Sequence, residues 1–137
     1  MKDDPREIDE GDLVELDFLQ AVAARLPRDE WVLKALADLY TRVGRYEDGL
    51  QVDRRLAGLC PKEAQVWYNL GCSLALLHQR DAALHSLKKA VTLGYNDYEW
   101  MIRDSDLKSL RDEKGFKSLI QRLTSGVEKK ANDPENA

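Results

Sequence analysis

The stretch Tyr40-Thr41-Arg42-Val43-Gly44-Arg45-Tyr46 has a counterpart 34 residues later, which begins at Leu74. The same offset relates prolines and apolar residues on both sides of this stretch. The pairs are Pro27 with Pro61, Leu36 with Leu70, Leu50 with Leu84, and Leu56 with Ala90. A fixed period of this length indicates a chain built from repeated supersecondary units, each of which buries its apolar face against the next.

The apolar residues within these units follow a helical spacing. Between Asp12 and Leu26 they recur at intervals of three and four, as one face of a helix requires. Pro27 should end this helix, because proline disfavours helical geometry in the residue before it. Asp29 is the expected N-cap of the next helix. Gly44 is its expected left-handed stop, since glycine adopts positive φ without steric cost.

The segment Trp67-Tyr68-Asn69-Leu70-Gly71 and the pair Gly44/Tyr46 resemble the tetratricopeptide repeat, whose period is 34 residues. This resemblance implies an all-α fold. Its helix-turn-helix repeats would form a right-handed superhelical stack, with about two and a half repeats and a helical C-terminal cap.

The resemblance also sets the expected boundaries. A half repeat at 12–26 precedes full repeats at 27–60 and 61–94, and capping helices follow at 97–125. A disordered acidic arm at 1–11 and a disordered tail at 126–137 are expected to flank them. The cap beginning at Asp104 resembles the tail that closes bacterial arrays of this family, and we expect it to cover the apolar face of residues 84–93.

Several positions decide how well each repeat matches. Gly49 and Gly71 occupy places where two helices cross closely, and Trp67 is expected to fill the core of the second repeat. Asp53 stands where the family usually has an apolar residue. His78 replaces the glycine of the turn.

Composition and charge argue against a nucleic-acid-binding, membrane-inserted or secreted protein. The net charge is −4, with charged residues at 34% and hydrophobic residues at 43%. The basic residues are too few and too evenly mixed with acids for a nucleic-acid partner. No apolar run reaches the ~18 residues that membrane insertion needs. The first residues lack the apolar core of a secretion signal, and the two cysteines lack a ligand spacing, so we expect a reduced, cytoplasmic protein.

No catalytic, metal or cofactor site can be assembled from the sequence. His78 and His85 have no third ligand at a fitting spacing and are interpreted as surface histidines. Cys60 and Cys72 have no nearby basic residue in sequence, which favours inert, partly buried thiols. We therefore expect a protein that is not an enzyme and holds neither cofactor nor metal.

The resemblance implies a concave groove lined by the first helix of each repeat. The residues it places there are Trp31, Lys34, Asp38, Arg42, Gln65, Tyr68, Asn69 and Cys72. Trp31 could instead be a displaced core residue. Lys34 and Asn69 match positions that clamp a carboxylate in some family members, but Asp38 would repel such a ligand.

The function implied is that of an adaptor or scaffold that binds a protein or peptide partner in this groove, as a monomer or weak homodimer. Two alternatives remain at this point: a small acidic secretion or assembly chaperone, and a structural subunit of a homo-oligomer. The convex face is the alternative binding surface.

Overall fold

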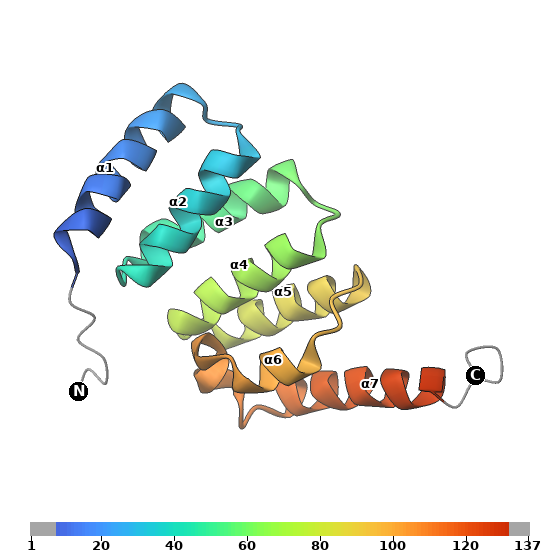
Figure 1. Ribbon diagram of the computed structural model, residues 1–137. Coiled ribbons are helices and arrows are strands. Elements are labelled where there is room, and N and C mark those ends of the chain that lie inside the picture. The colour runs from blue at the N-terminus through green and yellow to red at the C-terminus, as the bar shows by residue number, and fades with distance from the viewer. Residues whose placement is uncertain (1–7, 132–137) are drawn as a thin grey trace. The chain divides into compact units, whose positions relative to one another are not determined.

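The computed structural model describes residues 8–131, with side chains described through residue 126. This part of the chain is all-α, which confirms the predicted fold class. Its elements are packed as neighbouring pairs in chain order (Figure 1). The chain divides into two compact units, Met1–Pro61 and Lys62–Ala137.

The first unit holds α1 (Glu10–Arg25), α2 (Glu30–Arg42) and α3 (Tyr46–Leu59). Asp9 caps α1 by accepting a hydrogen bond from the Gly11 amide, so this helix begins two residues before the expected Asp12. Asp29 caps α2 through the Val32 amide, which confirms the predicted cap. The helices share an apolar core. Its buried members include Leu16, Leu33, Leu36, Leu50 and Leu56.

The second unit begins with the helix pair α4 (Ala64–Leu76) and α5 (Arg80–Thr92). A Cβ added to Gly71 would lie 2.8 Å from Leu87 Cδ2, so only glycine fits at this crossing. At Gly49, in the first unit, the same test finds ordinary contacts at 3.5 Å, and an alanine would fit there. Room for an alanine at Gly49 agrees with the expected small residue, whereas Gly71 has no room even for a Cβ unless Leu87 shifts.

Three further elements complete the second unit: α6 (Tyr98–Arg103), the 3-10 helix η1 (Ser105–Leu110) and α7 (Lys114–Ala131). α7 packs on α5, where Gly115 approaches Leu84, but η1 packs mainly on α4. The C-terminal segment therefore covers α4 as well as residues 84–93, which were the only part that it was expected to cover. α7 also continues to Ala131, beyond the predicted end at residue 125. The rest of the predicted tail, 132–137, and the arm at 1–7 lie outside the described residues.

The inter-helix turns repeat the 34-residue period in their hydrogen bonds. The Arg45 amide donates to Tyr40 O at 2.8 Å, and the Gln79 amide donates to Leu74 O at 2.9 Å. This bond pattern at a helix end requires a left-handed residue. Gly44 supplies it with φ 81°, as predicted, and His78 supplies it with φ 59°.

Replacing His78 with glycine is expected to stabilise the protein by about 1 kcal/mol, because a residue with a Cβ is strained in the left-handed region whereas glycine is not. Urea denaturation followed by circular dichroism measures the change. Gly44→Ala is the matched control and should shift the midpoint in the opposite direction. A His78→Gly variant less stable than the parent protein would show that the histidine side chain stabilises the turn by contacts of its own.

Trp67 is not the core residue that the sequence predicts. Its ring is half-buried, and the Lys89 ammonium lies 5.5 Å from the ring centroid. The buried side chains beside it in α4 are Val66 and Tyr68, one residue to either side. Leu87, which is fully buried, lies against Gly71.

Candidate functional site

The predicted groove residues of the first unit form one exposed stripe on α2. Trp31, Lys34, Asp38 and Arg42 are three or four residues apart, a spacing that keeps them on one helix face. Trp31 is 85% exposed, so the alternative of a displaced core residue is wrong. An indole with this exposure contributes almost nothing to the core. It is the large apolar side chain that this stripe presents to solvent.

Arg42, at the C-terminal end of this stripe, forms ion pairs with two acids of α1. Arg42 Nη2 lies 3.5 Å from Asp12 Oδ1 and 3.4 Å from Glu15 Oε2. Both acids compensate the guanidinium charge, so Arg42 presents less net positive charge to a ligand. Lys34, one turn from Trp31, is the base nearest the indole in sequence on this face.

In the second unit the predicted residues separate into two pairs. Gln65 and Asn69 are exposed, and the Gln65 amide donates to Asn69 Oδ1 at 2.9 Å. Tyr68 and Cys72 are buried, and Tyr68 retains only 2% exposure. The expectation that Tyr68 offers an open surface to a ligand is therefore wrong, because the segment containing Tyr95 and Asp104 covers it.

The covering contact is a buried polar cluster. Tyr68 donates from its hydroxyl to Asp104 Oδ2 at 2.6 Å, and Cys72 Sγ lies 3.6 Å from the same oxygen. The Tyr95 ring stacks on Tyr68 with centroids 4.2 Å apart. Asp104 also caps η1, because its Oδ1 accepts from the Asp106 amide at 3.0 Å. The sequence places Asp104 only at the start of the expected cap, and its role as a buried acceptor has no local signal.

Burial governs the protonation of this cluster. It raises the pKa of Tyr68 and of the Cys72 thiol, with the nearby Asp104 acting in the same direction on both. Burial likewise raises the pKa of Tyr95 to about 12. All three groups therefore stay protonated at neutral pH. A protonated, enclosed thiol is a poor nucleophile, which agrees with the expectation of an inert Cys72.

Cys72, Asp104 and Asp106 bring their ligand atoms within 4.8 Å of one another, a separation that a cation could bridge. Both oxygens of Asp104 accept hydrogen bonds, from the Tyr68 hydroxyl and from the Asp106 amide. The contacts in this cluster are those of a structural connection between α4 and η1.

The first unit also carries an open groove of about 420 Å³ between α1 and α3. Leu36 and Tyr40 line it from α2, on the side of that helix opposite Trp31, as the helical spacing requires. Its polar edge includes Gln51 and Arg55, neither of which the sequence singled out. The volume falls in the range of small-ligand pockets, so this groove is the competing surface of the unit.

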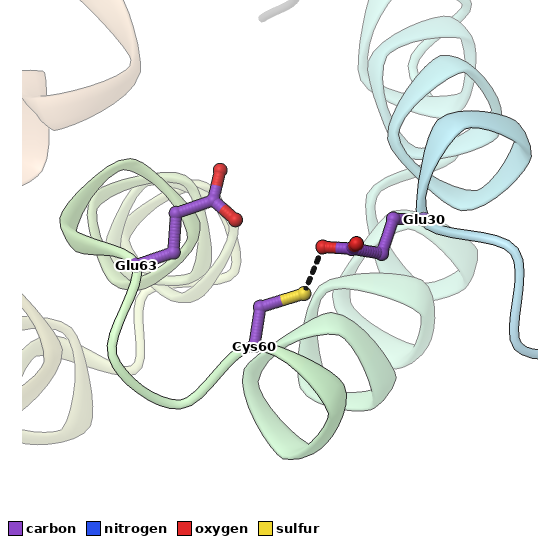
Figure 2. A group of neighbouring side chains, drawn as sticks. All are labelled: Glu30, Cys60 and Glu63. Atoms are coloured by element: carbon purple, nitrogen blue, oxygen red, sulfur yellow. Dashed lines mark hydrogen bonds between the residues drawn. The ribbon is translucent and has the colours of Figure 1, made fainter.

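Cys60 has a structural role at the end of α3. Its Sγ donates to Glu30 Oε1 at 2.6 Å, which connects the end of α3 to the first turn of α2 (Figure 2). The Cys60 thiol is half-buried, which agrees with the predicted partial burial. His78 and His85 are both exposed, as predicted for surface histidines.

Within residues 8–131, every helix is too short or too polar to cross a bilayer. No family model matches the chain. Over 87 residues, 61% of the chain, it is 34% identical to a chloroplastic protein of Arabidopsis thaliana. This match covers 26% of that protein, so the chain spans about a quarter of the length of this relative. The relative is a chloroplastic plant protein, so it supports neither the expected cytoplasmic location nor a special link to the bacterial arrays that the cap resembles.

Proposed function

We propose that the chain is a non-enzymatic module of the tetratricopeptide-repeat type that binds a protein or peptide segment on the exposed face of α2. The repeat assignment is supported by the 34-residue period, which recurs in the sequence and in the turn bonds at Arg45 and Gln79. The helix pairs α2/α3 and α4/α5 follow the same period.

The observation that carries the binding function is the exposure of Trp31, at 85%. Tryptophan is among the residues that dominate the energy of protein interfaces, because it buries a large rigid surface and can donate one hydrogen bond. Stability does not explain an indole in water on a helix whose core face is already filled by Leu33 and Leu36. A bound partner does explain it.

The charges beside Trp31 define the chemistry of that partner. Lys34 favours an acidic group next to the apolar anchor that contacts the indole. Asp38 follows one turn later and disfavours a run of acids. The ligand that fits is a segment with one bulky apolar residue and a neighbouring acid, rather than a strongly acidic tail.

The partner can be identified by placing a photo-crosslinking amino acid at Trp31, with the same group at exposed Arg54 of α3 as the control. A protein captured only from position 31 is then purified and titrated against variants. Trp31→Ala and Lys34→Glu are expected to weaken binding by about tenfold or more, because they remove the apolar anchor and reverse the favourable charge. Arg54→Glu and Lys88→Glu, which lie on other exposed faces, should leave the affinity within about twofold.

Folding provides the control for these variants. Since Trp31 is almost fully exposed, Trp31→Ala should leave the free energy of unfolding, measured by urea denaturation, unchanged within about 0.5 kcal/mol. A second variant, Gln51→Trp, fills the groove between α1 and α3 without touching the Trp31 face. Loss of binding in Gln51→Trp together with normal binding in Trp31→Ala would move the site to that groove and refute the proposal.

A further inference from the structure

Helix α1 carries apolar side chains on two opposite faces. Leu16 and Ala23 are buried against the rest of the first unit, as one core-facing side requires. Val14 and Phe18, however, are 69% and 64% exposed. A helix at the surface of a unit ordinarily presents a polar outer face, so this second apolar side indicates a covered surface.

The exposed face has an ordered pattern along the helix. Its residues are spaced four, four, three and four apart, which keeps them in one row, and each is exposed. In chain order they are Glu10, Val14, Phe18, Ala21 and Arg25. The row therefore reads acid, apolar, aromatic, apolar, base, and we call it the α1 row. When a second α1 row runs in the opposite direction, its base faces the acid of the first row and the apolar residues face one another.

We propose that the α1 row binds the α1 row of a second copy of this chain, with the two helices antiparallel. A two-fold axis beside Phe18 places the two Phe18 rings together at the centre. It also places Val14 opposite Ala21 of the other copy. Glu10 then faces Arg25 of the other copy, and the symmetry repeats this ion pair at the far end. A two-fold interface requires such self-complementarity, because the same patch serves both partners.

Among the other charges on α1, exposed Asp17 lies one residue before Phe18 and places a like charge from each copy near the two-fold axis, which keeps the dimer weak. Asp12 and Glu15 lie toward α2 and pair with Arg42 inside the same unit. Within the described residues, neither Glu10 nor Arg25 forms an ion pair. The α1 row lacks the basic surplus that an anionic membrane would attract. Its balanced ends fit a second copy better than a lipid surface.

The expected dimer is weak. A single pair of helices offers few residues for an interface, and we expect a dissociation constant of roughly ten to a few hundred micromolar. This inference goes beyond the proposed function, since it concerns a different helix from the Trp31 face. The two can fail separately, because Trp31→Ala should leave dimerisation unchanged.

Sedimentation equilibrium of the full chain at low salt tests the proposal. The parent protein should show a concentration-dependent dimer. Phe18→Lys should weaken dimerisation by more than about tenfold, because it places two like charges at the two-fold axis. Arg54→Glu on α3 is the matched surface control and should leave the dissociation constant within about twofold.

The charge swap tests the antiparallel arrangement itself. Glu10→Arg and Arg25→Glu should each weaken the dimer by about tenfold, since each creates two repulsive pairs. The double variant restores both pairs with reversed sign, and its dissociation constant should return to within about threefold of the parent value. Glu10 lies in the first turn of α1, where a base disfavours the helix, so circular dichroism is recorded for every variant.

Three results would overturn the proposal: a parent protein that stays monomeric at millimolar concentration, a dimer unaffected by Phe18→Lys, or a double variant no tighter than the single ones. The charge swap stands without the Phe18 variant, should the latter fold poorly.

Discussion

Removal of residues 104–137 is expected to unfold the second unit and cause aggregation. This deletion takes away η1 and α7, whose four main apolar side chains are at most 4% exposed: Leu107, Leu110, Phe116 and Leu119. Burying each contributes about 1.5–3 kcal/mol, or roughly 6–12 kcal/mol together. A domain of this size is stable by only about 5–15 kcal/mol. The apolar surface of α4 and α5 left behind would associate with other molecules, as uncapped repeats do.

Circular dichroism, urea denaturation and light scattering measure this loss. Deleting only residues 132–137 is the control, because it removes none of these buried side chains, and its unfolding midpoint should match that of the full chain. Leu107→Ala grades the effect and should cost about 2–5 kcal/mol, the usual range for a buried leucine. A soluble chain ending at residue 103 that kept cooperative unfolding of α4 and α5 would contradict the role assigned to the cap.

The parts of the fold that were predicted from sequence rest on local signals. Asp29 lies three residues before the amide it caps, and Gly44 adopts the φ that its turn requires within a few residues of α2. His78 takes the same conformation because the 34-residue period imposes the turn, even though histidine is strained there. Short-range chemistry and a fixed period therefore suffice for the helices and their pairing.

The burial of Tyr68 could not be predicted in the same way. Its partner Asp104 lies 36 residues away in sequence and outside the repeating part, so the period carries no information about the contact. Trp67 and Tyr68 are neighbours in α4, and side-chain size alone predicts that the larger indole fills the core. The hydroxyl of Tyr68 finds a buried acceptor, whereas the indole remains half-buried beside Lys89.

In the candidate site, too, local spacing could be predicted from the sequence, whereas burial by distant segments could not. Trp31, Lys34, Asp38 and Arg42 could be placed on one face because they share a helix, and helical spacing alone fixes that relation. Whether a face stays open depends on what packs against it, which is a matter of distant sequence. The α2 stripe is exposed in its unit, while Tyr68 and Cys72 on α4 are covered by the segment that follows α5.

Asp104→Ala should destabilise the second unit by about 2–4 kcal/mol. The substitution leaves the buried Tyr68 hydroxyl without its acceptor, which costs about 1–3 kcal/mol. It also removes the cap that accepts from the Asp106 amide, worth about 1 kcal/mol. Asp104 is 6% exposed, so water cannot readily replace either bond. Asp104→Asn keeps an oxygen for one acceptor and should cost less than Asp104→Ala.

A double-mutant cycle with Tyr68→Phe isolates the contact. Each single variant should lower the urea midpoint, and the double variant Tyr68→Phe/Asp104→Ala should lose less than the two combined. The expected coupling is about 1 kcal/mol or more, because the second substitution removes a partner that the first has already left unsatisfied. The ring of Tyr68 stays in place in Tyr68→Phe, so stacking on Tyr95 is retained and the cycle reports the hydroxyl alone. Additive losses would mean that the hydroxyl and Asp104 act independently, and that apolar packing of η1 on α4 holds the segment in place without this hydrogen bond.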